Sequence, residues 1–493
     1  MMKKLQLNSI GLMLVILTSL STQSKAQYEV QQKLVGDREQ RAEFGTSTSM
    51  NSQYLAVGAS RENIATGAVY VYQKNQNETW EFHQKIQAED GHEMAEFGGA
   101  MKMGDNFLAI ASGRADIGDA LRAGAIYLYD LTDGSFVFNS KLVASDYSDD
   151  SLLGANPTCI DISGNTLVAG APGTNDWAGA VYVFQKINEN WTEVQKVTAP
   201  EPIEYSNFGI GVSISGNTLI VGASGENNGK GAVYVYEKNA NGFWEFQQKL
   251  ESSTPQTNSY FGNSLHIHEN QFVVGAYAEG NPGTDYASAY VFQKNGETWE
   301  ETQRLVGESS SEDSFYGWMT QISENHLWIS APHFFGQEAG KVYHYTKSSE
   351  GIWNLAELIQ PNESMEEDAF GWSFQAFGET LAVGATRDDF DENQENELMD
   401  AGSVFIFYHN NLSNLESQPT EVSVKIYPNP AQDYLFIQSD EPIQSVKVYD
   451  SMGKLMFESS KNQIEISQLP KGIYFLKILT KSQNTSTHRI IKH

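Results

Sequence analysis

The chain has 493 residues, with 32 Lys and Arg against 62 Asp and Glu, which gives a formal net charge of −30. Such an acidic protein repels polyanions, so nucleic acid and anionic lipid are excluded as partners, and cations or basic surfaces are favoured. The single cysteine, Cys159, excludes a disulfide framework, so stability must come from packing.

Residues 1–26 have the pattern of a secretory signal peptide. Lys3 and Lys4 precede an apolar run from Ile10 to Leu20, and the small residues that follow suit cleavage after Ala26. This run is shorter than the roughly 20 apolar residues that a membrane-spanning helix needs, and no later segment approaches that length. The sequence therefore predicts export of the chain and no transmembrane segment.

Residues 27–410 repeat one pattern seven times. Each copy begins with a large apolar residue followed by glycine, and these pairs are Phe44-Gly45, Phe97-Gly98, Leu153-Gly154, Phe208-Gly209, Phe261-Gly262, Tyr316-Gly317 and Phe370-Gly371. The pairs recur every 53 to 56 residues. A fixed period of this size is typical of solenoids, propellers and repeat arrays.

Each copy predicts four short β-strands. The fourth copy shows them over residues 208–214, 219–223, 231–236 and 244–250, which are rich in β-branched and aromatic residues and are separated by Gly, Asn and Ser. The third of these strands is apolar on both faces, so its sheet must be covered on both sides. Radially packed propeller blades provide that arrangement, and the sequence predicts an all-β, seven-bladed β-propeller.

The first strand of the mature chain predicts how the propeller closes. The seventh copy stops without its fourth strand, whereas residues 28–34, YEVQQKL, closely match the fourth strand of the fourth copy, WEFQQKL at residues 244–250. The N-terminal strand is therefore expected to complete the last blade. An open solenoid would have no reason for this offset.

One face of the propeller is expected to bind ligand. Connections between strands two and three, and from strand four to the next blade, share a face and are irregular, whereas the turns on the opposite face are short and repetitive. Four aromatic residues in the irregular loops are candidate ligand contacts, with burial against neighbouring loops as the alternative: Trp177, Phe334, Phe335 and Phe390. Trp318 and Trp372, which follow aromatic-Gly pairs, are expected to fill the channel instead.

An acidic loop on the same face is the candidate metal site. Its alternating oxygen ligands resemble the spacing of a calcium loop, but no glycine occupies the turn position: Asp389, Asp391, Asn393 and Glu395. Calcium is the ion that this loop would take. The alternative is a solvated acidic loop.

A different pattern begins after a polar linker at residues 411–420. Residues 421–493 contain about seven short alternating strands, which predict a small Ig-like β-sandwich.

Two resemblances follow from these motifs. The repeats resemble the FG-GAP family of integrin α propellers. Short turns such as Ser215-Gly216-Asn217 replace the Asp-rich calcium loop of that family, so the chain is more similar to a calcium-free bacterial subtype.

Residues 421–493 resemble the type A sorting domain of the type IX secretion system of Bacteroidetes. The matching motif positions are Tyr427, Pro428, Asn429, Pro430, Gly453, Gly472 and Tyr474. This resemblance implies contact with the type IX machinery and a location outside a Gram-negative cell, either secreted or on the outer-membrane surface.

The functional prediction is a secreted or surface-attached binding propeller that adheres to a glycan or protein. The sequence contains no motif for a catalytic triad, a phosphate loop or a zinc protease. Two alternatives stay open. One is a hydrolase or lyase with its site at the channel mouth, and the other is a structural surface-layer component.

Overall fold

The computed structural model of the chain describes residues 28–37, 39–188, 190–278, 287–307, 315–333, 339–361, 367–391, 393, 397–409, 424–427, 431–439, 442–450, 455–459, 461–480 and 485–492. The expected signal peptide, residues 1–26, and the expected linker, residues 411–420, lie outside these ranges. No helix in the described ranges is long and apolar enough to cross a bilayer.

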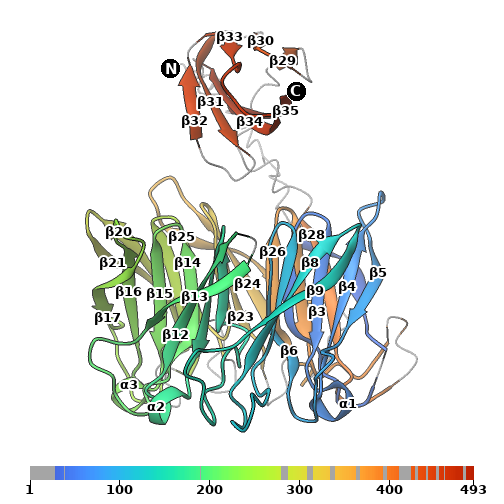
Figure 1. The fold of residues 1–493 in the computed structure, drawn as a ribbon, viewed down its shortest axis with the longest axis vertical. Helices are drawn as coiled ribbons and strands as arrows, with labels where there is room; N and C mark the ends of the chain where they lie inside the picture. Colours follow the sequence, from blue (N-terminus) through green and yellow to red (C-terminus); the bar gives the residue numbers. More distant parts are fainter. Residues whose placement is uncertain are drawn as a thin grey trace, which may run out of the picture.

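The described residues before the linker form seven four-stranded antiparallel sheets, numbered here as blades in the order of their innermost strands (Figure 1). Blade 1 contains β2 (Phe44–Met50), β3 (Tyr54–Ala59), β4 (Ala68–Lys74) and β5 (Trp80–Ile86). Blade 2 contains β6 (Phe97–Met103), β7 (Phe107–Ser112), β8 (Ala125–Thr132) and β9 (Ser135–Leu142). Blade 3 contains β10 (Ile160–Ser163), β11 (Thr166–Ala171), β12 (Ala180–Ile187) and β13 (Asn190–Val197).

Blade 4 contains β14 (Phe208–Ser215), β15 (Thr218–Ala223), β16 (Ala232–Lys238) and β17 (Trp244–Leu250). Blade 5 contains β18 (Leu265–His268), β19 (Gln271–Ala276), β20 (Ser288–Asn295) and β21 (Thr298–Val306). Blade 6 contains β22 (Thr320–Ile322), β23 (His326–Ala331), β24 (Lys341–Lys347) and β25 (Trp353–Ile359). Blade 7 contains β26 (Phe370–Phe377), β27 (Thr380–Ala385), β28 (Ser403–His409) and β1 (Tyr28–Leu34).

The blades form a closed ring. The innermost strand of each of blades 1 to 5 contacts that of the next blade, β26 contacts β23 of blade 6, and β26 also contacts β2 of blade 1. Each hydrophobic core lies between two neighbours; for example, Val181 and Val183 of blade 3 pack with Phe208 and Val212 of blade 4. The strands that are apolar on both faces are therefore covered on both faces, as the sequence predicts.

The N-terminal strand completes blade 7. β1 pairs antiparallel with β28, with Tyr28 opposite His409 and Leu34 opposite Val404. At the junction of blades 7 and 1, Leu34 and Val404 share a core with Phe44 and Tyr70. The closure predicted from the sequence is thus present in the structure.

Glycine in the second strand allows neighbouring blades to approach closely at the axis. A Cβ added to Gly170, Gly222 or Gly275 would lie 1.8 to 1.9 Å from the carbonyl oxygen of the glycine in the next blade's aromatic-Gly pair. Such a contact is far inside van der Waals range, so the backbones must separate if a side chain is introduced. The recurrent Val-Gly-Ala motif therefore reflects the packing of one blade on the next.

Backbone hydrogen bonds repeat at the junctions between blades. The short elements α1 (Glu62–Ala65), α2 (Thr174–Trp177) and α3 (Glu226–Gly229) are left-handed turns, since their last residues have positive φ. Their carbonyls accept hydrogen bonds from the segment that leads into the next blade, as in Glu96 N to Ala65 O at 2.8 Å and Asn207 N to Trp177 O at 2.9 Å. Blade 7 holds blade 1 in the same way, with Glu43 N donating to Asp400 O at 3.1 Å.

A glutamine side chain in the outer strand forms a recurrent pair of hydrogen bonds to the next blade. The side chain of Gln32 in β1 donates to Trp80 O at 2.8 Å and accepts from Trp80 N at 3.0 Å, which joins blade 7 to blade 1. Gln195 makes the same two bonds with Trp244 of the following blade. The Gln of the recurrent Gln-Lys-Leu motif therefore binds the Trp that begins the outer strand of the next blade.

The C-terminal residues form two sheets around one core. One sheet has the order β29 (Val424–Tyr427), β30 (Tyr434–Ser439) and β33 (Gln463–Glu465). The other has the order β32 (Leu455–Ser459), β31 (Ile443–Asp450), β34 (Gly472–Thr480) and β35 (Thr485–Lys492). Leu435 of the first sheet and Val448 and Leu476 of the second belong to the same buried cluster. This is the β-sandwich that the alternating strands predict.

We expect Gly222→Ala to destabilise the propeller by about 1–3 kcal/mol, because the added methyl group overpacks the junction with blade 5. The change in free energy of unfolding can be measured by denaturant titration. Gly99→Ala is the matched control, since its added Cβ would meet only Glu96 O at 3.2 Å, and it should remain within about 1 kcal/mol of wild type. Equal stability of the two variants would contradict this account of the glycine.

The buried ion pair between Lys33 of β1 and Asp388 of blade 7 gives a second prediction. Lys33 Nζ lies 2.7 Å from Asp388 Oδ2, both side chains are almost fully buried, and Ser403 also donates to that carboxylate. Lys33→Ala leaves this carboxylate uncompensated and should cost about 3 kcal/mol. The double variant Lys33→Met/Asp388→Asn should recover most of the loss, because it buries no charge.

Lys196→Ala provides the control for that measurement in equilibrium unfolding. Lys196 occupies the corresponding position in blade 3, but its partner Asp146 is half exposed, so the loss should stay below about 1 kcal/mol. If Lys33→Ala were no more destabilising than Lys196→Ala, the closing ion pair would have no special role.

Candidate ligand site at the mouth of the axial channel

A cavity of about 330 Å³ opens at the mouth of the axial channel. We call it the mouth cavity. Its walls come from blades 1, 2, 3, 4 and 7: Glu43, Thr46, Ser60, Arg61, Glu96, Gly99, Arg114, Leu152, Ala155, Asn156, Pro157, Pro172, Trp177, Ile210 and Trp372. It lies on the face that carries α1, α2 and α3, at the bottom of Figure 1. This is the face of the 2–3 and 4–1 connections on which the sequence predicts a ligand.

The channel beyond the mouth is much narrower. A second cavity, of about 40 Å³, is lined by the innermost strands and includes Lys102, His266 and Gln321. About 10–15 Å³ of such space admits one water molecule, so this cavity holds only a few waters. Ligand pockets usually range from about 300 to 1,000 Å³, and the volume of the mouth cavity falls in that range.

An unusual backbone conformation positions side chains around the mouth. The residue before each aromatic-Gly or Leu-Gly pair is not glycine, yet it has a positive φ in every blade: Glu43, Glu96, Leu152, Asn207, Tyr260, Phe315 and Ala369. A left-handed conformation costs a non-glycine residue about 1–2 kcal/mol, which the hydrogen bonds at the blade junctions offset. The seven positions are equivalent in the backbone, but their side chains differ in charge, size and shape.

Two glutamate–arginine pairs form one side of the cavity. Arg61 Nε lies 3.2 Å from Glu43 Oε1, and Arg114 Nε lies 3.3 Å from Glu96 Oε2. Burial raises the pKa of the Glu43 carboxyl, although Arg61 and Arg387 act to lower it. Charged donors and acceptors are therefore available to a polar ligand on this side.

Aromatic side chains extend from the other side across blades 5, 6 and 7. We call this set the aromatic strip: Tyr260, Tyr277, Phe315, Trp318 and Trp372. Tyr277 stacks on Tyr260 with ring centroids 5.5 Å apart and meets Trp318 edge-on at 5.2 Å. Trp318 Nε1 donates to Trp372 O at 3.0 Å. All five are half-buried, so they leave ring surface exposed beside the cavity.

The predicted ligand aromatics occupy different places. Trp177, in α2, is 39% exposed and lines the mouth cavity. Phe390 is half-buried in the acidic loop, where its backbone N donates to Asp388 Oδ1 at 2.9 Å. Phe334 and Phe335 lie outside the described residues. Trp372, which the sequence assigns to filling the channel, also lines the cavity.

Carboxylates of the acidic loop accept hydrogen bonds from backbone N–H groups of the same loop. Asp389 Oδ1 accepts from Asp400 N at 2.7 Å, and Asp391 Oδ1 accepts from Asn393 N at 3.0 Å. Glu395 lies outside the described residues. Calcium binding by this loop stays a prediction, with the solvated loop as its alternative.

The sorting-motif positions lie in the C-terminal sandwich. Tyr427 ends β29, half exposed, and stacks on Phe436, whereas Gly472 begins β34. Tyr474 is buried, and its hydroxyl donates to Pro470 O at 2.9 Å. Pro428, Asn429, Pro430 and Gly453 lie outside the described residues.

Ionic hydrogen bonds hold the connections beneath the mouth. Asp90 Oδ1 accepts from the Tyr127 hydroxyl at 2.8 Å, and its Oδ2 lies 2.8 Å from Lys141 Nζ. Asp146 repeats this arrangement in blade 3 with Tyr182 and Lys196. In blade 4, Glu226 occupies the corresponding place against Tyr234 and Lys249. The Lys of the Gln-Lys-Leu motif therefore anchors a loop of the mouth face.

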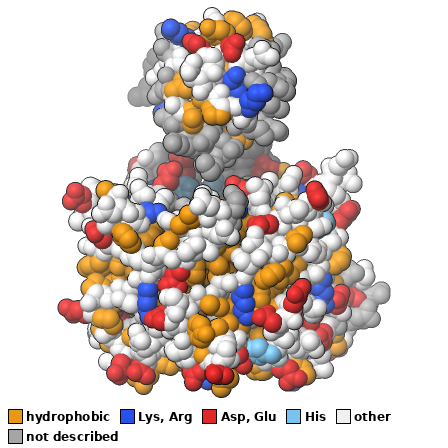
Figure 2. All heavy atoms as spheres, in the orientation of Figure 1, with side chains coloured by type: hydrophobic (Ala, Val, Ile, Leu, Met, Phe, Trp, Pro, Cys, Tyr) orange, Lys and Arg blue, Asp and Glu red, His pale blue; other side chains and the backbone are white. Residues whose placement is uncertain are grey.

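Acidic residues extend well beyond these anchors. Figure 2 shows Asp and Glu side chains scattered over the drawn face of the propeller, not gathered in one patch. The wide spread is consistent with the strong negative net charge.

The anchors predict acid sensitivity. Burial acts to raise the pKa values of Asp90 and Asp146, but their Lys and Tyr partners outweigh burial and hold both pKa values below the ordinary range. The unfolded chain then binds more protons than the folded chain as acidity increases. The stabilisation is therefore complete above the unfolded Asp pKa of about 3.9 and is lost as pH falls through the folded values.

The double variant Asp90→Asn/Asp146→Asn should have a lower Tm than wild type at pH 7 and a smaller difference near pH 3. Thermal melts across pH 7 to 2.5 measure this convergence. A Tm difference that stayed constant with pH would rule out the ionised carboxylates as the cause.

Comparison with protein families assigns both parts of the chain. Residues 136–184, 191–236, 244–292 and 353–407 match the family model for the FG-GAP repeat. Residues 425–493 match the model for the secretion system C-terminal sorting domain. The chain therefore carries FG-GAP repeats followed by a type IX sorting domain, and it is secreted or attached to the cell surface of a member of the Bacteroidetes. A search of curated proteins finds no match to the chain.

Sequence reasoning did not identify the full site. It predicted the face on which the mouth cavity opens and named Trp177, but it missed the glutamate–arginine pairs and the Tyr260, Tyr277 and Phe315 part of the aromatic strip. A usable signal exists, because Glu43, Glu96, Tyr260 and Phe315 all stand directly before a repeat-starting pair. Comparing this position across the copies would have pointed to these four residues, although not to Arg61, Arg114 or Tyr277.

Proposed function

We propose that the propeller is an adhesion module that binds a glycan in the mouth cavity and along the aromatic strip. The observation that carries the proposal is a cavity of about 330 Å³ with charged pairs and exposed aromatic rings on its rim. A sugar ring offers apolar C–H faces for an aromatic surface and hydroxyl groups for Arg and Glu side chains. This mixture of a few polar groups with apolar walls is typical of small-ligand sites.

The surroundings of the cavity support a binding face. Several apolar side chains on the same connections are about half exposed or more, among them Ile64, Met94, Leu121 and Tyr205. Exposed apolar side chains beside a cavity can contribute to an interaction site. The export route also supports the proposal, since a secreted or surface-attached propeller meets extracellular glycans.

A hydrolase or lyase is the second candidate function, and the environment of Glu43 favours it. Its carboxyl lies at the edge of the cavity and burial raises its pKa, which is the direction of shift that favours a general acid. Turnover of a bound glycan, abolished by Glu43→Gln without loss of binding, would assign this function.

The adhesion proposal is tested with the full mature chain on glycan and protein arrays, followed by affinity measurement on the strongest glycan. Trp177→Ala and the double variant Arg61→Ala/Arg114→Ala should each weaken binding about 10-fold or more, because side chains in such positions often contribute over 1 kcal/mol. Phe243→Ser is the control. It removes an exposed aromatic from a turn on the opposite face and should leave the affinity unchanged.

The outcomes separate the alternatives. Binding that both cavity variants leave intact would place the ligand elsewhere. Binding to proteins but to no glycan would assign a protein adhesin, and an array without any hit would reject the adhesion proposal.

A further inference from the structure

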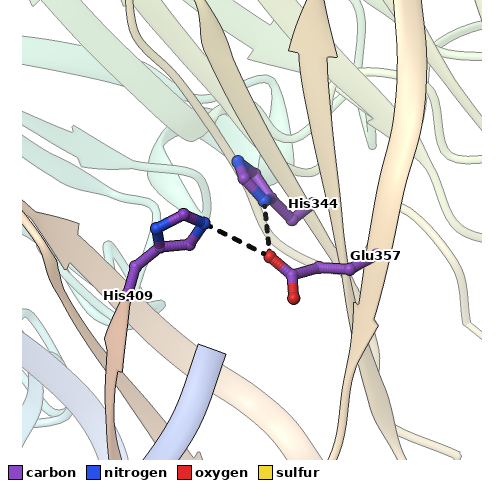
Figure 3. A group of neighbouring side chains, drawn as sticks. All are labelled: His344, Glu357 and His409. Carbon is purple, nitrogen blue, oxygen red and sulfur yellow. Dashed lines mark hydrogen bonds and ion pairs between the residues drawn. The ribbon is translucent and has the colours of Figure 1, made fainter. Parts of the chain in front are cut away.

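A buried cluster joins blades 6 and 7 at the point where the ring closes (Figure 3). His344 lies on β24 and Glu357 on β25 of blade 6, and His409 ends β28 of blade 7. His344 and His409 are 1% and 0% exposed, and the Glu357 side chain is 13% exposed. The cluster is therefore built into the interior and is separate from the mouth cavity.

The three side chains converge on one point. One ligand atom from each residue lies within 4.8 Å of the other two. His344 Nδ1 is 3.1 Å from Glu357 Oε1, and His409 Nε2 is 3.6 Å from the same oxygen. The second distance is too long for a hydrogen bond. Ligands about 2.1 Å from a tetrahedral zinc ion lie about 3.4 Å from one another, close to both distances.

Neighbouring groups orient two of the three candidate ligands. His344 Nε2 lies 2.9 Å from His326 Nδ1, which leaves Nδ1 of His344 directed at the cluster. Tyr28 N donates to Glu357 Oε2 at 3.1 Å, so Oε1 faces the two imidazoles. Ligating His and carboxylate groups in metal sites usually have such partners on their outer atoms.

Tyr28 adds an independent observation. Its hydroxyl is buried and has the Trp328 indole as a hydrogen-bonding neighbour. Its ring lies edge-on to both His344 and His409, with centroid distances of 5.4 and 4.6 Å. The buried Tyr28 ring therefore packs against both imidazoles and connects β1 to the cluster.

We infer that His344, Glu357 and His409 form a binding site for a divalent transition metal, zinc by preference, that fastens blade 6 to the closing strands of blade 7. Two imidazoles and one carboxylate suit zinc better than calcium, which prefers an all-oxygen cage. Because His409 lies on β28, and Tyr28 on its partner strand β1, the ion would stabilise the closed ring. The site is structural, since its ligands are buried away from the mouth cavity.

The test uses the full chain without a polyhistidine tag, stripped with chelator and then titrated with Zn²⁺. We expect about one tightly held ion per chain by elemental analysis after desalting, as the three ligands define one site. We also expect a rise in Tm on adding Zn²⁺ and visible absorption bands of tetrahedral Co²⁺ when cobalt replaces zinc. Glu357→Gln and His409→Gln should each lose this ion, whereas His268→Gln, a histidine outside the cluster, should keep it.

His326→Gln keeps the inference falsifiable if the buried variants do not fold. It alters only the partner of His344 and should weaken zinc binding about 10-fold or more while the chain stays folded. The inference is overturned if stripped wild-type protein shows neither a Zn²⁺-dependent Tm nor a tetrahedral Co²⁺ spectrum. It is equally overturned if folded Glu357→Gln holds as much zinc as wild type.

Discussion

The fold depends on the junction between one blade and the next. At the axis, a glycine of the second strand meets a backbone carbonyl of the following blade, and at the rim, left-handed turns accept hydrogen bonds from the segment that enters that blade. On the outside, glutamine side chains join neighbouring outer strands. These contacts satisfy backbone groups that irregular loops would otherwise leave unpaired. The same bonds between blades 7 and 1 close the ring without a disulfide.

The rigid junction also explains how one face can vary. Backbone hydrogen bonds hold the residue before each repeat-starting pair, so its backbone conformation does not depend on one particular side chain. Glutamate, leucine, asparagine, tyrosine, phenylalanine and alanine all occupy this position. The ring therefore presents seven side chains in equivalent places, and their differences produce a charged side and an aromatic side around one cavity. The proposed ligand site uses side chains at this position, whereas the fold is common to all seven copies.

The fold could be predicted from the sequence to a large extent. Seven copies of four strands, the closing role of residues 28–34 and the seven strands of the C-terminal sandwich follow from periodicity and from strand patterns that repeat. The candidate site could be predicted only in part. The ligand face and Trp177 follow from the irregularity of the loops. The pairing of Glu43 with Arg61 depends on a turn whose left-handed conformation cannot be predicted from its residue types. His344 and Glu357 belong to the sixth copy and His409 to the seventh, and the three share no motif.

The sequence by itself determined the number of blades, the closure by the N-terminal strand and the export signal at the C-terminus, because repetition makes weak local preferences add up. The tertiary structure alone decided which side chains meet. Glu357 lies 52 residues before His409, about one repeat away, and ring packing alone brings them within 3.6 Å. Tyr28, at the other end of the propeller sequence, reaches the same cluster because β1 pairs with β28. Contacts between repeats depend on the curvature and closure of the ring, which no local pattern encodes.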